Sequence, residues 1–146
     1  RINADQPREA VADEVRAAIP RADLWAALDT FEYVRRSGRV GWAAAMVGEL
    51  FHIKPIIRLY DGVVSSVTRT RTPQRAFAAL VELAHSAGPL ERLAVMHSHF
   101  PQGGQRLAEA LSDLAPLAEI PLVDVTPVLG VHVGPNALGV AVLRQA

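Results

Sequence analysis

The chain has 146 residues, with 15 basic and 15 acidic side chains, so its formal net charge at pH 7 is zero. Half of the residues are hydrophobic, which is enough for one domain with its own core. The balanced charge argues against a nucleic-acid-binding surface, and the lack of cysteine excludes disulfides and thiol catalysis. No apolar run reaches the roughly 18 residues of a membrane span, so we expect a cytoplasmic protein.

The first predicted element is an amphipathic helix over residues 7–19, which opens on a proline and ends before Pro20. Its apolar residues recur at helical spacing: Val11, Val15 and Ile19. Residues 23–28 fit either a strand or a helix. Residues 30–36 read as a second helix, with Thr30 as N-cap and Ser37-Gly38 as the stop.

Residues 41–51 form an apolar run of small side chains and are predicted to be a third helix. Residues 53–60 and 63–69 are β-rich and flank Asp61-Gly62, which is the strongest short hairpin signal in the chain. Thr72-Pro73 then opens a helix that runs to about residue 85.

The C-terminal part alternates strands with helical patterns. Strands are predicted over residues 93–96, 120–125 and 137–143, with a helix over residues 102–114 between the first two. The helix between two strands indicates a parallel crossover, whereas the hairpin must be antiparallel. The expected fold class is therefore α/β, one mixed β-sheet with helices packed on it.

A glycine-punctuated segment, Gly130-Val131-His132-Val133-Gly134-Pro135-Asn136, is predicted to be a loop between the last two strands. Its histidine could present a polar group at the mouth of an apolar cavity and pair with an anion. The alternative is a tight turn with a buried, hydrogen-bonded histidine.

The evidence for a metal site or a catalytic site elsewhere in the chain is weaker. His97 and His99 are placed two residues apart on a strand, where both could face one metal, but no third ligand is suggested and a solvated strand end is the preferred interpretation. We find no nucleophile elbow and no pair of carboxylates placed for catalysis, so the prediction is a protein that is not an enzyme, with no metal and no cofactor.

Several segments together resemble the DegV family of bacterial fatty-acid-binding proteins. They are LDTFEYVRRSGRVG (28–41), HIKPII (52–57), DG (61–62), RTRT (69–72) and TPVLGVHVGPNALGVAV (126–142). The match covers about residues 24–143. It implies that residues 1–146 are a single domain similar to the family's C-terminal lobe, with the N-terminal lobe absent from this chain.

The resemblance also implies a function. Family members hold a long-chain fatty acid in a tunnel and present its carboxylate to a separate ATP-dependent fatty acid kinase, whose product feeds phospholipid synthesis. His132 matches the family histidine at the carboxylate, and Arg39, Arg69 and Arg71 match arginines on the face offered to the kinase. Two residues of the loop depart from the family pattern: Val133 replaces a threonine, which removes a hydroxyl from head-group recognition, and Asn136 replaces a glycine.

The leading hypothesis is therefore a fatty-acid-binding domain, with transient membrane contact for ligand exchange. The apolar side chains expected to line the acyl chain are Met46, Leu50, Phe51, Ile53, Ile56 and Leu129. One alternative is an interaction or oligomerisation domain without a ligand. Another is an enzyme that uses His132 as a general base on a small anionic substrate.

Overall fold

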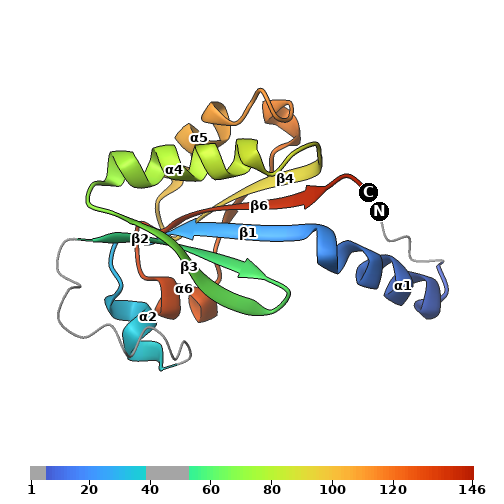
Figure 1. Ribbon diagram of the computed structural model, residues 1–146, viewed down its shortest axis with the longest axis horizontal. Coiled ribbons are helices and arrows are strands. Elements are labelled where there is room, and N and C mark those ends of the chain that lie inside the picture. The colour runs from blue at the N-terminus through green and yellow to red at the C-terminus, as the bar shows by residue number, and fades with distance from the viewer. Residues whose placement is uncertain (1–5, 39–52) are drawn as a thin grey trace.

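The computed structural model describes residues 6–38 and 53–146. In these residues six strands form one mixed sheet, in the order β3-β2-β1-β6-β4-β5. Helices α4 and α5 cover one face of the sheet, and α2 and α6 cover the other (Figure 1). The predicted fold class, a mixed sheet with helices packed on it, is confirmed.

The elements follow one another along the chain. The helices are α1 (Arg8–Ala18), α2 (Glu32–Ser37), α4 (Pro73–Ser86), α5 (Pro101–Ala110) and α6 (Pro127–Val133), with 3₁₀ turns at Ile19–Arg21 and Leu117–Glu119. The strands are β1 (Ala22–Ala27), β2 (Lys54–Tyr60), β3 (Val63–Thr70), β4 (Leu90–His97), β5 (Leu122–Asp124) and β6 (Leu138–Arg144). The ambiguous segment at residues 23–28 is a strand, and the helix predicted over 41–51 lies outside the described residues.

The pairing of the strands agrees with the sequence. β4 and β5 are parallel and are joined through α5, as the predicted crossover requires, and the other neighbours are antiparallel. Asp61 and Gly62 both have positive φ, at 48° and 72°, which is the backbone that a two-residue hairpin turn needs. The Thr72 hydroxyl accepts a hydrogen bond from the Arg75 amide at 3.2 Å, so α4 starts where predicted.

The loop predicted at residues 130–136 is wrong for most of its length. Residues 127–133 form the short helix α6, and only Gly134-Pro135-Asn136 remains a connection. Pro127 stands at the first helical position, where its fixed φ suits a helix, and Gly134 ends the helix with a φ of +75°. The helix predicted over 102–114 is also shorter, since α5 ends at Ala110.

The sheet separates two clusters of buried side chains. The larger lies under α4 and α5 and includes Ile56, Leu80 and Val95, whose side chains are fully buried. The smaller lies on the other face and includes Phe31 and Ile57. Full burial of one such side chain stabilises the fold by about 1.5–3 kcal/mol, so both faces contribute to stability.

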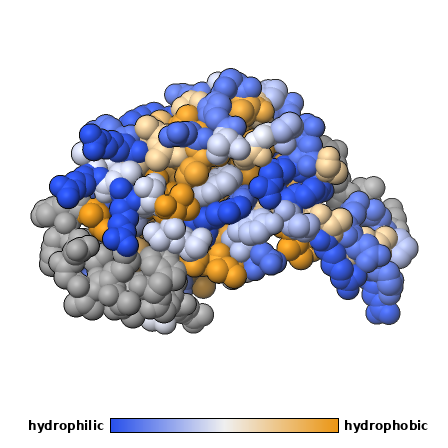
Figure 2. Space-filling view, in the orientation of Figure 1, coloured by the Kyte–Doolittle hydropathy of each residue, from blue (hydrophilic) through white to orange (hydrophobic). Residues whose placement is uncertain are grey.

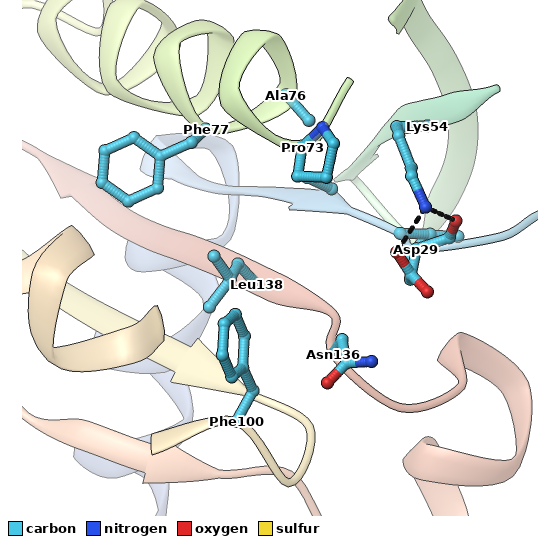
Figure 3. Close-up of a pocket in the computed structure, with 10 residues that line it drawn as sticks. Asp29, Lys54, Pro73, Ala76, Phe77, Phe100, Asn136 and Leu138 are labelled. Carbon is cyan, nitrogen blue, oxygen red and sulfur yellow. Dashed lines mark hydrogen bonds and ion pairs between the residues drawn. The ribbon is translucent and has the colours of Figure 1, made fainter. Parts of the chain in front are cut away.

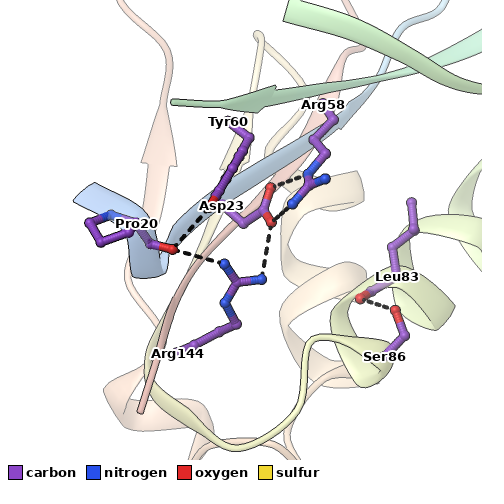
Figure 4. A network of polar contacts seen from close by, with 7 residues as sticks. All are labelled: Pro20, Asp23, Arg58, Tyr60, Leu83, Ser86 and Arg144. Atoms are coloured by element: carbon purple, nitrogen blue, oxygen red, sulfur yellow. Dashed lines mark hydrogen bonds and ion pairs between the residues drawn. The ribbon is translucent and has the colours of Figure 1, made fainter. Parts of the chain in front are cut away.

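A buried ion network joins three strands at the end of the sheet opposite α2 (Figure 4). The side chain of Asp23 in β1 has no exposed surface and binds Arg58 of β2 through both carboxylate oxygens. Arg144 of β6 lies 3.5 Å from the same carboxylate and also donates to the carbonyl of Pro20. Tyr60 stacks against both guanidinium groups, so the network is closed by cation–π contacts.

Helix α1 extends away from the body and has no buried residue (Figure 1). Figure 2 shows it as a largely hydrophilic arm, whereas the main body has apolar patches exposed among hydrophilic surface. Among the described residues no helix is both long and apolar enough to cross a membrane.

Candidate functional site

An apolar cavity lies between α6 and the sheet. Its volume is about 130 Å³, and its walls present only apolar surface. The sheet contributes the wall on one side through β1, β2, β4 and β6, and the helix closes it on the other. The main wall residues are Leu24, Ala26, Ile57, Leu59, Met96, Leu129 and Val133.

Helix α6 covers this cavity because of its own pattern. Leu129 and Val133 are four residues apart, so they lie on one face of the helix and both contact the cavity. Val128 and Val131 are on the outer face, with 77% and 64% of their surface exposed. A short helix that is apolar on both faces is unusual on a protein surface, so the outer face is a candidate interaction surface.

His132 lies in the last turn of α6 and precedes Val133 in the chain, but it is not one of the residues that line the cavity. Its Nδ1 atom is buried and has no hydrogen-bond partner within the described part of the chain. A buried polar atom without a partner destabilises a protein by about 1–3 kcal/mol, and most such atoms in native proteins are satisfied. The ring can therefore gain from an external hydrogen-bonding group, such as a carboxylate.

The connection after α6 is held against α2. Gly134 donates its amide to the Gly130 carbonyl at 2.8 Å, and its α-carbon faces the ring of Tyr33. Tyr33 does not line the apolar cavity, but it contacts the end of α6, and this contact was not predicted from the sequence. The signal that could have found it is the glycine, since a glycine with positive φ often marks a close approach of the backbone to a side chain.

The predicted wall residues divide into four groups. Leu129 lines the cavity. Ile56 is fully buried in the cluster under α4, and its neighbour Ile57 faces the cavity because strand side chains alternate. Ile53 lies in a separate hollow, and the remaining three, Met46, Leu50 and Phe51, lie outside the described residues.

The predicted kinase-facing arginines come together in part. Arg69 and Arg71 line one open hollow at the end of β3, together with Ile53 and Thr70. Two cations on one concave surface form a candidate site for an acidic partner. Arg39 lies outside the described residues.

The two strand-end histidines do not converge. The ring of His97 is buried and packs on α5, where its Cδ2 lies 2.7 Å from the position of a Cβ on Gly104. His99 is exposed, and its amide donates to Asp124 at 3.0 Å. The solvated strand end expected here therefore describes His99 but not His97. Within residues 6–38 and 53–146 no group of three potential ligands could hold a metal ion.

The comparisons with known proteins decide the family. A family model described as "Uncharacterised protein, DegV family" matches residues 2–145. The chain belongs to the DegV family. A DegV domain-containing protein of Streptomyces coelicolor is 38% identical over 134 residues, which is 90% of this chain and 47% of that protein.

Two solved structures support the same assignment. The DegV family protein Cg2579 of Corynebacterium glutamicum has 29% identity and a TM-score of 0.84, over 97% of this chain and 55% of the other. DegV of Bacillus subtilis, described as a fatty acid binding protein, has 26% identity and a TM-score of 0.79, over 98% of this chain and 52% of the other. The chain thus spans about half the length of the DegV proteins that it matches.

Proposed function

We propose that this chain binds a long-chain fatty acid, with the acyl chain in the apolar cavity under α6 and the carboxylate at His132. The observation that carries the proposal is that one helix, α6, holds both the unpartnered Nδ1 of His132 and two side chains, Leu129 and Val133, that line a largely apolar cavity. Each methylene group that leaves water contributes about 0.8 kcal/mol, while a carboxylate in apolar surroundings needs a donor. A fatty acid meets both conditions, and DegV relatives described as fatty acid binding support the choice.

The size of the cavity suggests that other parts of the protein complete the site. A cavity of about 150 Å³ holds one benzene molecule, so about 130 Å³ accommodates only part of a long acyl chain. We propose that residues 1–146 are the C-terminal lobe of a DegV protein and that the other lobe supplies further walls and hydroxyl groups for the carboxylate. Met46, Leu50, Phe51 and Ile53 stay candidates for the acyl wall. The buried Ile56 takes no part in this proposal.

The proposal gives the chain a carrier role without catalysis of its own. A separate ATP-dependent kinase would phosphorylate the bound carboxylate in the cytoplasm, and the acyl phosphate would enter phospholipid synthesis. Arg69, Arg71 and Arg39 are the proposed docking residues, because a kinase with an acidic surface would be attracted to a cationic hollow. Transient contact with a membrane would supply the ligand.

Native mass spectrometry followed by solvent extraction tests the binding. It should be run on the 146-residue chain and on its full-length parent, both purified from bacteria. A bound C14–C18 acid on either protein is the expected result. A parent that carries no fatty acid, and takes up none from oleate added at micromolar concentration, would contradict the proposal.

A second candidate function rests on the exposed outer face of α6. Val128 and Val131 leave two apolar side chains largely exposed to water on this face. Such a surface favours self-association or a protein partner. Light scattering across protein concentrations separates the two functions, since an interaction domain would associate without any lipid.

A further inference from the structure

A second cavity lies on the opposite face of the sheet, under the N-terminal end of α4 (Figure 3). Its volume is about 230 Å³, and the proposed fatty acid site does not use it. Ala76 and Leu138, which line it, belong to the core cluster under α4 and α5. The acyl cavity lies on the α6 face instead, and the two cavities share one lining residue, Leu138, so a test that separates them uses the other lining residues.

One end of this cavity is apolar. Phe77 of α4 and Phe100, just before α5, project into it from two sides, with Leu138 between them (Figure 3). Ala76 of α4 also lines the cavity, and its small side chain leaves the volume between the two rings unfilled. Because a cavity of about 150 Å³ with apolar walls holds benzene, a benzyl or isobutyl group fits here.

The other end carries both signs of charge. The backbone pairing of β1 and β2 continues past Ala27, since the Leu28 amide donates to the Pro55 carbonyl at 3.0 Å. This pairing sets Asp29 beside Lys54, whose ammonium donates to the Asp29 carbonyl at 2.7 Å and also pairs with its carboxylate oxygen Oδ1. An ammonium has three protons, so one N–H of Lys54 remains for a ligand.

The Asp29 carboxylate also keeps binding capacity. Lys54 contacts Oδ1 and leaves Oδ2, and 40% of the Asp29 side chain is exposed. Asn136 adds an amide at the same end of the cavity (Figure 3). The polar end therefore offers a cation, an anion and an amide, with no net charge.

We propose that this cavity binds a free α-amino acid with an apolar side chain. The side chain would lie between Phe77 and Phe100, the carboxylate at Lys54 and Asn136, and the ammonium at Asp29. A ligand with only a carboxylate would be repelled by the carboxylate of Asp29. A ligand with only an amine would be repelled by the ammonium of Lys54. A zwitterion can pair with both, because its carboxylate is attracted to the ammonium of Lys54 and its ammonium to the free carboxylate oxygen of Asp29.

A ligand series on the unmodified chain tests this without any mutation. L-phenylalanine, 3-phenylpropanoate and phenethylamine share one apolar group and differ in their charges. In an NMR titration we expect L-phenylalanine to shift the amide signals of Ala76 and Phe77, which line this cavity and not the acyl cavity. The two singly charged analogues should bind about tenfold more weakly, since each lacks one charge-assisted hydrogen bond. Equal binding of 3-phenylpropanoate, or no shift at these residues with millimolar L-phenylalanine, would overturn the proposal.

Variants then locate the site. Lys54→Met and Asp29→Asn should each weaken L-phenylalanine about tenfold, and Ala76→Met should fill the cavity and abolish binding. Asp61→Asn, in the exposed hairpin turn, is the matched control and should bind as the unmodified chain does. If the NMR spectrum of a variant shows that it does not fold, the ligand series on the unmodified chain still tests the proposal. Unchanged affinity in folded Lys54→Met and Asp29→Asn would contradict the assignment.

Discussion

Gly134 and Tyr33 approach so closely that a Cβ on Gly134 would lie 2.3 Å from Cδ2 of the tyrosine ring. Real Cβ contacts are never this short, so any other residue at position 134 must displace the ring or the helix. Tyr33 belongs to α2 and Gly134 ends α6, so this contact fixes the distance between the two helices on one face of the sheet.

The first prediction concerns Gly134→Ala. Gly134 has φ of 75° and ψ of 176°, a region that is essentially restricted to glycine and costs other residues about 1–3 kcal/mol. The overlap with Tyr33 adds to this loss, which urea unfolding would measure. Gly62→Ala is the control, because Gly62 has a φ of 72° but open space around it. Equal losses in the two variants would show that the Tyr33 contact contributes nothing.

The second prediction concerns Asp23→Ala. Removing this buried carboxylate leaves Arg58 and Arg144 without their shared partner, and breaking a buried pair costs about 3–5 kcal/mol. The side chains of Arg58 and Arg144 are 36% and 31% exposed, so we expect the loss of stability to lie near the lower end of this range. Asp13→Ala removes a fully exposed ion pair with Arg16 and should cost about 0–1 kcal/mol. Thermal unfolding that does not separate the two variants would contradict a structural role for the network.

Much of the fold could be predicted because its signals are local. Asp61-Gly62 specifies a hairpin by its backbone preferences, and Thr72-Pro73 starts α4 in the same way. Helix α6 could not be predicted, since three of its seven residues are valine and one is glycine, which favour strands or turns. Packing of Leu129 and Val133 against the sheet overrides that preference.

The candidate site was predictable in its chemistry but not in its walls. The pattern around His132 indicates a polar group next to apolar segments, but only the three-dimensional structure reveals that Nδ1 lacks a partner. The choice between Ile56 and Ile57 depends on which face of β2 lies under α6, and the sequence of one strand does not contain that information.

The third prediction concerns the pH dependence of stability. Both ring nitrogens of His85 lie 2.8 Å from an acceptor, the Val81 carbonyl and the Asp113 carboxylate. Both hydrogen bonds raise the pKa of His85 above its usual 6.5, and the bond to the Val81 carbonyl has the larger effect. The resulting stabilisation is complete below the ordinary pKa of histidine and is lost as the pH rises through the raised value.

Asp113 acts in the opposite direction. Its hydrogen bond with His85 lowers the pKa of the Asp113 carboxyl, so that contribution is present above the ordinary aspartate pKa and is lost as the pH falls through the lowered value. NMR titration of Asp113→Asn should show a lower pKa for His85 that still exceeds the ordinary value, because the Val81 carbonyl remains. An unchanged pKa would contradict the pairing. Glu119→Gln, at an exposed position, is the control.

The fourth prediction concerns His132→Ala. If His132 binds the fatty acid carboxylate, the variant should lose about 1–3 kcal/mol of affinity for oleate, measured by calorimetry on the full-length parent. The stability of the unliganded protein should not fall, because the variant removes a buried atom that has no partner in the described structure. His99→Ala, at an exposed residue, should bind normally. Unchanged affinity in His132→Ala would remove this residue from the site.

The fifth prediction separates docking from binding. Arg71 is exposed and lines the hollow at the end of β3, which shares no lining residue with the apolar cavity. Arg71→Glu reverses one charge on the proposed kinase-facing surface, so phosphorylation of bound fatty acid by the partner kinase should become slower and less dependent on salt. Oleate affinity should stay unchanged. Arg92→Glu makes the same charge change at an exposed position on β4 and should leave both measurements unaltered. Equal loss of oleate affinity and of kinase rate in Arg71→Glu would show that the arginine supports the fold or the ligand and is not a docking residue.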